Sequence, residues 1–219
     1  MKFKTAEKFI SLNGEGPLAG QPAVFIRFAG CNLRCGYCDT AWAQEFDTGE
    51  DMSLEEIVRY VRESGVRNVT LTGGEPLMRD NMGELIAALL RIPCHVEIET
   101  NGSMDISDIA KMSPRPAFTL DYKLPGSGME GAMLTSNYEY LQRDDAVKFV
   151  AGSMDDLLRA EEIIHGYKLT EKCRVYFSVV FGQLELSKAA EFIISHKING
   201  AALQLQMHKY IWDPNRRGV

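Results

Sequence analysis

The sequence predicts an α/β fold in which a mostly parallel sheet forms an open or partial barrel of the (β/α)6 type. Short runs rich in β-branched and aromatic residues alternate with amphipathic helical patterns, which is typical of parallel sheets with right-handed crossovers. Runs such as RVYFSVVF are apolar almost throughout, as expected of parallel strands buried on both faces. About six such units are too few for a complete eightfold barrel.

Seven strands are expected, each bounded by Gly, Pro, Asn or Asp. In chain order they are 24–28, 68–73, 95–100, 117–123, 146–152, 174–182 and 201–207. Amphipathic helices are expected between them, over 53–64, 81–92, 105–112, 154–167 and 187–198. Ser53 and Glu56 form a capping box at the start of the first helix, and Ser153 with Asp156 gives a weaker version of that signal. No repeat or linker divides the chain, so residues 1–219 are expected to form one domain.

Composition excludes several classes of protein. The chain has 219 residues, of which 45% are hydrophobic, and its net charge of −6 does not favour nucleic acid as a partner. No apolar run resembles a signal peptide or reaches the roughly 20 residues of a membrane span, so we expect a cytoplasmic protein without a membrane partner. In a reducing compartment, clustered cysteines indicate metal binding or redox chemistry rather than disulfides.

Three of the five cysteines lie within eight residues, as Cys31-x3-Cys35-x2-Cys38, directly after the strand at 24–28. Loops at the carboxyl ends of barrel strands are where active sites are expected. A structural zinc site normally takes four ligands in paired spacings, and Cys94 and Cys173 are isolated. An electron-transfer cluster also normally takes four thiolates. Three thiolates on a four-iron cluster would leave one iron open to a substrate or cofactor.

This cysteine loop resembles the signature of radical S-adenosylmethionine (radical SAM) enzymes. The resemblance implies a 4Fe-4S cluster held by Cys31, Cys35 and Cys38, with SAM chelating the open iron through its amino and carboxylate groups. Reduction of the cluster would then cleave SAM to a 5′-deoxyadenosyl radical. Tyr37 fits this pattern, because an aromatic residue commonly precedes the third cysteine and lies near the adenine.

Three further motifs follow strand ends: LTGGEP (71–76), EIETNG (97–102) and DYKLPGSG (121–128). Paired glycines allow close backbone approach and Glu75 offers an acceptor for an ammonium group. A strand-to-helix turn, a solvated Asn-Gly turn and an exposed ion pair are the structural alternatives. By resemblance, the following residues would bind SAM: Tyr37, Cys38, Asp39, Gly74, Glu75, Glu99, Asp121, Tyr122, Lys123 and Ser178.

The N-terminal segment adds a glycine-rich turn at 13–16 and Arg27, four residues before Cys31. The turn offers backbone groups and a carboxylate suited to a guanine-like edge, and Arg27 offers a fork for a carboxylate. A hairpin turn with a surface arginine is the structural alternative. Together with the motifs above and the tail QMHKYIWDPNRRGV, this segment closely resembles the 7-carboxy-7-deazaguanine synthase family along nearly the whole chain.

That resemblance implies a lyase of queuosine and 7-deazapurine biosynthesis. It would convert 6-carboxy-5,6,7,8-tetrahydropterin to 7-carboxy-7-deazaguanine, with ring contraction, loss of ammonia and regeneration of SAM. Mg2+ would be a further cofactor, with Thr40 as its protein ligand. The pterin substrate would be held by the N-terminal turn and closed in by the C-terminal tail, through Leu12, Asn13, Gly14, Glu15, Arg27, Thr72, His208 and Pro214. Catalytic roles are expected for Glu15, Arg27, Glu99 and His208.

The resemblance also implies a homodimer and a reductant protein, either flavodoxin or ferredoxin. Two other functions share part of the pattern. A glycyl-radical-enzyme activase would carry the cysteine loop and the GGEP motif, but it would not need the N-terminal turn and Arg27 as a pterin clamp. A non-catalytic metal-binding module would leave the motifs at the other strand ends without a role.

Overall fold

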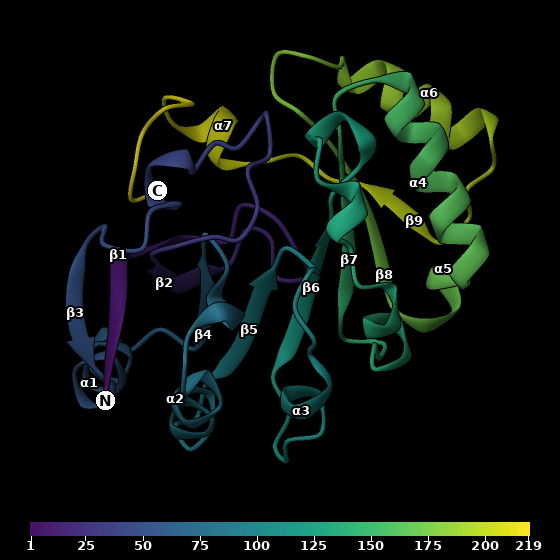
Figure 1. The fold of residues 1–219 in the computed structure, drawn as a ribbon. Helices are drawn as coiled ribbons and strands as arrows, with labels where there is room; N and C mark the ends of the chain where they lie inside the picture. The colour runs from purple at the N-terminus through teal and green to yellow at the C-terminus, as the bar shows by residue number, and fades with distance from the viewer.

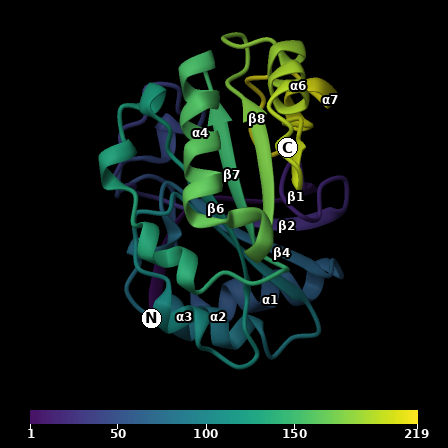
Figure 2. The same cartoon turned by 90° about the vertical axis from the view of Figure 1, so that its right-hand side faces the viewer.

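The computed structural model describes all 219 residues and contains one nine-stranded sheet (Figures 1 and 2). The strands are β1 (Lys2–Leu12), β2 (Pro22–Phe28), β3 (Glu50–Ser53), β4 (Asn68–Gly73), β5 (His95–Thr100), β6 (Ala117–Tyr122), β7 (Ala146–Ala151), β8 (Arg174–Val179) and β9 (Ala201–Leu203). Their order in the sheet is β3-β1-β2-β4-β5-β6-β7-β8-β9. From β2 through β4 to β9 neighbouring strands run parallel, and the order does not close on itself, which confirms the predicted partial barrel.

The helices are α1 (Leu54–Ser64), α2 (Met82–Leu89), α3 (Ser107–Ala110), α4 (Met154–Tyr167), α5 (Leu169–Lys172), α6 (Leu186–Ser195) and α7 (His208–Ile211). Figure 1 shows α4, α5 and α6 grouped outside β7, β8 and β9, whereas α1, α2 and α3 lie along the other half of the sheet. Between β6 and β7 the chain forms short 3-10 turns instead of a helix. None of the helices combines the length and the apolar character needed to cross a bilayer.

Helix α1 begins as its sequence predicts. The hydroxyl of Ser53 accepts a hydrogen bond from the backbone N–H of Glu56 at 3.2 Å, and the Glu56 carboxylate accepts from the Ser53 N–H at 2.7 Å. The helix ends at Gly65, whose φ of +68° favours glycine. At α4, Ser153 accepts from the Asp156 N–H, but the Asp156 carboxylate binds the N–H groups of Gly126 and Gly152 instead of completing a box.

Alternation along the inner strands separates an apolar face from a polar one. On β6, Phe118, Leu120 and Tyr122 belong to the hydrophobic core beneath the helices. Thr119 and Asp121, between them in sequence, point to the other side and line a cavity. The strands are buried on both faces as predicted, but the inner face of the barrel is polar. Its polar side chains are therefore available to bind a ligand in the cavity.

Strands β1 and β3 were not predicted. Charged residues interrupt the apolar positions of β1, and a register shift between Thr5 and Glu7 breaks its alternation. β1 pairs antiparallel with β2 and with β3, where Lys4 forms a 3.2 Å ion pair with Asp51. The glycine-rich turn therefore connects β1 to β2, and β1 contributes its own side chains to the cavity.

β6 and β7 each end one residue before their predicted ends, and two other strands were predicted too long by more than that. β8 ends at Val179 rather than at 182, and β9 ends at Leu203 rather than at 207. Beyond these ends the chain leaves the sheet and crosses the mouth of the barrel. The segment after β9 is consequently free to contact the turn that precedes β2.

Candidate active site

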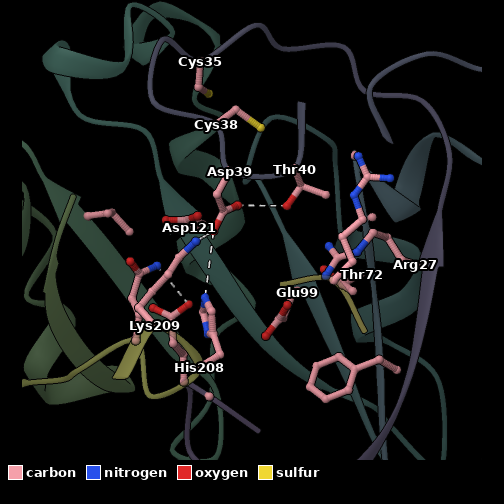
Figure 3. Close-up of a pocket in the computed structure, with 18 of the residues that line it drawn as sticks. Arg27, Cys35, Cys38, Asp39, Thr40, Thr72, Glu99, Asp121, His208 and Lys209 are labelled. Atoms are coloured by element: carbon pink, nitrogen blue, oxygen red, sulfur yellow. Dashed lines mark hydrogen bonds and ion pairs between the residues drawn. The ribbon is translucent and has the colours of Figure 1, made fainter. Parts of the chain in front are cut away.

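A cavity of about 700 Å3 opens at the carboxyl ends of the parallel strands. Its wall combines the loop after β2, the ends of β4 to β7, the turn between β1 and β2, and the C-terminal tail. This is the location predicted for a site in a barrel of this type. Its volume lies within the range of sites that bind small molecules. Figure 3 shows the side chains that meet there.

The structure brings most of the predicted site residues together. Those that line the cavity are Leu12, Gly14, Glu15, Arg27, Cys31, Cys35, Tyr37, Cys38, Asp39, Thr40, Thr72, Gly74, Glu99, Asp121, Lys123, His208 and Pro214. Glu99 lies between His208 and Thr72, and Arg27 stands on the far side of Thr72 (Figure 3). The remaining predicted residues lie outside the lining: Asn13, Glu75, Tyr122 and Ser178.

Three of these four residues do not line the cavity because they are buried beneath it or occupy the other face of their strand. Asn13 is buried below the cavity, where its amide donates to Glu97 at 3.4 Å. Tyr122 faces the helices and its hydroxyl donates to Glu130 at 2.8 Å, so its side chain does not reach the cavity. Ser178 is buried beside Val150 in the strand register, with its hydroxyl unpartnered.

The cysteine loop faces the cavity with all three thiols (Figure 3 labels Cys35 and Cys38). Arg34 donates to the carbonyl of Cys31 at 2.7 Å and so holds the backbone of the loop. Burial raises the pKa of the Cys31 and Cys35 thiols. No three His, Cys, Asp or Glu side chains converge as the ligands of a single ion do. Three thiols without a fourth ligand suit a four-iron cluster with one open iron better than a structural zinc site, which normally takes four ligands.

The glycines of the TGGEP motif bring β4 against the cysteine loop. The Gly74 N–H donates to the carbonyl of Phe28 at 3.0 Å, and the Glu75 N–H donates to the carbonyl of Gly30 at 2.9 Å. A Cβ atom at position 74 would lie 2.2 Å from the Gly30 oxygen. The close approach predicted for these glycines is therefore an approach to the protein's own backbone, at the edge of the cavity.

Glu75 organises the strand ends beneath the cavity. Its carboxylate accepts from the Asn101 N–H at 2.7 Å, the Thr100 hydroxyl at 2.9 Å and the Leu77 N–H at 3.0 Å. Burial raises the pKa of Glu75 to about 7. In this geometry the carboxylate joins the end of β4 to the end of β5.

Charged pairs fix several of the cavity's side chains. Arg27 donates from Nε to Glu7 at 2.8 Å, and Lys123 pairs with Asp121 at 2.5 Å. Glu7 was missed because β1 was not recognised as a strand. Lys148, also missed, lies on the inner face of β7; a lysine inside the apolar run AVKFVA was the signal that could have identified it.

The segment after β9 holds the glycine-rich turn in place. The side-chain amide of Gln204 accepts from the Gly16 N–H at 2.7 Å and donates to the Gly16 carbonyl at 2.9 Å. A Cβ atom on Gly14 would lie 2.7 Å from Nδ1 of His208. These positions lie far apart in the sequence, so no local pattern could connect them. The turn and the tail form one wall of the cavity.

The tail reaches across to the cysteine loop, and Figure 1 shows the yellow C-terminal segment beside the blue segment after β2. Lys209 forms a 3.3 Å ion pair with Asp39 and donates to the Pro214 carbonyl at 3.0 Å. Arg217 lies over the ring of Trp42, 4.1 Å from its centroid. Burial lowers the pKa of His208, which favours the neutral imidazole. The tail therefore shields one side of the cavity from solvent.

Two carboxylate oxygens at the cavity are buried without a hydrogen-bond partner: Oε1 of Glu15 and Oδ1 of Asp121. An unsatisfied buried acceptor costs free energy unless a ligand donates to it. The cavity thus presents thiols on one side and unfilled anionic acceptors on another. This donor and acceptor set fits an iron–sulfur cluster together with organic ligands that carry N–H and O–H groups.

Glu97 lies on the inner face of β5, below these residues, and is 2% exposed. Its oxygens accept from the Thr119 hydroxyl at 2.6 Å and from the Asn13 amide. Burial, followed by the neighbouring Glu99 carboxylate, raises the pKa of Glu97 from 4.5 to about 7. The carboxyl group is therefore neutral in mildly acidic solution and becomes costly to bury as it ionises.

Glu97→Gln should make stability less sensitive to pH. Because the folded pKa exceeds the unfolded value, the folded wild type binds the extra proton, and its stability falls as pH rises from about 4.5 to about 7. The introduced amide does not titrate, and it can donate to Thr119 while accepting from Asn13. The wild type loses about 1.4 kcal/mol of stability per unit of pKa shift as Glu97 ionises, and the variant should not show this loss. Unfolding midpoints measured at about pH 5 and about pH 8 should show that the stability of the variant relative to wild type increases with pH. A difference in stability that is the same at both pH values would contradict the raised pKa of Glu97.

Known proteins resemble this chain along its whole length. Residues 25–124 match the model of the radical SAM superfamily. A Clostridium acetobutylicum protein named 7-carboxy-7-deazaguanine synthase is 49% identical, with all of both chains covered. A Chlorobaculum tepidum protein of the same name is 36% identical over 98% of this chain and 96% of its own. The crystal structure of QueE from Escherichia coli matches with a TM-score of 0.76 at 24% identity, with 95% of each chain covered, which shows a shared fold.

Proposed function

The chain belongs to the 7-carboxy-7-deazaguanine synthase family of radical SAM proteins, and from this premise we propose that it converts 6-carboxy-5,6,7,8-tetrahydropterin to 7-carboxy-7-deazaguanine with loss of ammonia. One observation carries the proposal. A single cavity combines the three thiols of the cysteine loop with the N-terminal turn and the C-terminal tail. A glycyl-radical-enzyme activase would not require the last two elements.

A 4Fe-4S cluster and SAM are the cofactors that this family implies. Cys31, Cys35 and Cys38 would hold the cluster, and the Asp121–Lys123 pair would flank SAM. When bound, these cofactors supply the radical chemistry that removes a hydrogen atom from the substrate. The protein itself orients the reactants and excludes water, and the tail that crosses the cavity is suited to both tasks.

The substrate would lie between the turn and β2. Oε1 of Glu15, buried and unpartnered, suits the N–H groups of the aminopyrimidinone edge. The guanidinium of Arg27, held at Nε by Glu7, would direct its remaining N–H groups to the substrate carboxylate. His208 and Pro214 would close the opposite side. Glu99 faces the same space and would serve as an acid or base, because its buried position raises the pKa of the carboxyl.

Mg2+ is proposed as a further cofactor at Thr40. The Thr40 hydroxyl lines the cavity and donates to Asp39 at 2.9 Å. One hydroxyl is a small ligand set, but Mg2+ commonly keeps several waters and takes other ligands from its substrate. Bound there, the ion would neutralise the substrate carboxylate and fix its orientation.

Flavodoxin or ferredoxin is proposed as the reductant, and a homodimer as the assembly, in keeping with the family resemblance. The cytoplasm is the proposed compartment, because all five cysteines are free thiols, as expected in a reducing environment. A pull-down with the host's flavodoxin and ferredoxin, and a measurement of molecular mass in solution, would test these assignments.

Anaerobic incubation of the reconstituted protein with SAM, a reductant and carboxytetrahydropterin should yield the deazapurine product and ammonia. Mass spectrometry should show SAM unconsumed per turnover, and removal of Mg2+ by a chelator should lower the rate, with added Mg2+ restoring it. Cleavage of SAM without any deazapurine product would favour the activase over this proposal. Full activity after chelation would show that the reaction does not need Mg2+.

A further inference from the structure

Strand β7 carries a lysine into the interior of the barrel. Val147, Phe149 and Ala151 belong to the hydrophobic core on the helix side of β7. Lys148 alternates with them, points to the opposite face and lines the cavity, where it is 8% exposed. A buried ammonium group is costly unless carboxylates surround it. Its environment should therefore explain why it is there.

Three carboxylates from three different elements face Lys148. Glu15 comes from the turn between β1 and β2, Glu99 from β5 and Asp121 from β6. Burial by itself would lower the pKa of Lys148, but these carboxylates, Glu15 first, raise it above its ordinary value. These carboxylates favour the charged form of Lys148, and its Nζ forms an ion pair with Oε2 of Glu15 at 3.2 Å.

The two oxygens of Glu15 have different surroundings. Oε2 accepts from Lys148 and, at 3.4 Å, from the side-chain amide of Gln206. Oε1 is buried and has no hydrogen-bond partner. Two donors on one oxygen fix the orientation of the carboxylate and leave the other oxygen as an unused acceptor at the cavity.

We propose that Lys148 is a positioning residue that holds the Glu15 carboxylate by one oxygen and so presents the other to the N–H groups of the pterin's aminopyrimidinone edge. This inference rests on the proposed function, and it adds a residue from β7 to the substrate clamp formed by the turn. It implies that recognition of the pterin edge depends on Lys148, whereas SAM binding depends on it little. The affinity of ligands without N–H donors at that edge should not depend on Lys148.

Binding measurements on the SAM-loaded protein can isolate this role. The probe is 6-carboxypterin, an oxidised analogue whose fluorescence reports its binding. Lys148→Met should weaken 6-carboxypterin binding and raise the KM for the substrate at least about tenfold, as expected when a charge-assisted hydrogen bond is lost. The dissociation constant for SAM should stay within about twofold of wild type, and Lys148→Arg should recover part of the pterin affinity. Lys188→Met, on the exposed part of α6, is the matched control and should change neither constant.

Lys148→Met leaves buried carboxylates without their cation and so can fail to fold. A second comparison covers that case. The double variant Glu15→Gln, Lys148→Met removes both charges of the pair. Because Lys148 acts through Glu15, the double variant should bind 6-carboxypterin as Glu15→Gln alone does. A further loss in the double variant, an equal loss of SAM affinity, or wild-type pterin affinity in Lys148→Met would each overturn the positioning role. Failure of the wild type to convert the tetrahydropterin would instead refute the proposed function.

Discussion

Replacing Cys35 with alanine should abolish formation of the deazapurine product. Cys35 lies in the middle of the cysteine loop, and its thiol faces the cavity together with those of Cys31 and Cys38. Two remaining thiolates hold a four-iron cluster poorly, and the loop contains no further cysteine to replace the third. Anaerobically reconstituted variant protein should therefore contain much less iron and sulfide, lack the brown absorbance and leave SAM uncleaved.

Cys94→Ala is the matched control for this loss. Cys94 directly precedes β5, at the amino end of the strand and outside the cavity lining, and its thiol donates to the Leu89 carbonyl at 3.5 Å. The control should keep its iron content and its turnover. Wild-type turnover by Cys35→Ala would exclude the three-thiol cluster and every role assigned around it.

The sequence was sufficient for the parallel part of the sheet and for the cysteine loop, because both depend on local patterns. Apolar runs bounded by turn residues identified β4 to β8, and the spacing of Cys31, Cys35 and Cys38 identified the loop. The capping box identified the start of α1 for the same reason, since all its contacts lie within four residues. Local patterns carry such information without any knowledge of the tertiary fold.

What was missed depends on contacts between distant segments. β1 is half exposed and carries charges, so its strand character becomes visible only when it pairs with β2 and β3. The same holds for the link that the Glu75 carboxylate makes between two strand ends, because its partners follow separate strands. Gln204 and Gly16 are 188 residues apart in the sequence, and no local pattern predicts the hydrogen bonds between them.

Gly74→Ala should destabilise the protein and release its cluster. A Cβ atom at this position would stand 2.2 Å from the Gly30 carbonyl oxygen and 2.7 Å from Cβ of Cys31. The obstacle is backbone, so no side-chain rotation relieves it, and the end of β4 must move away from the cysteine loop. That movement would break the hydrogen bonds from Gly74 to Phe28 and from Glu75 to Gly30, which hold the start of the loop. We expect the free energy of unfolding to fall by at least about 2 kcal/mol, as for other overpacked sites.

Gly83→Ala provides the comparison, because a Cβ atom in the first turn of α2 would meet nothing within 4 Å. Alanine is favoured over glycine in a helix by up to about 1 kcal/mol, so this variant should be as stable as wild type or slightly more stable. Denaturant unfolding and iron content, measured on both variants, separate a general effect of alanine from the clash at the loop. Gly74→Ala protein that keeps wild-type stability and a full complement of iron would show that the cysteine loop does not need its contact with β4. If both properties fall together in that variant alone, then the paired glycines serve the cluster by letting two backbones touch, before any ligand is bound.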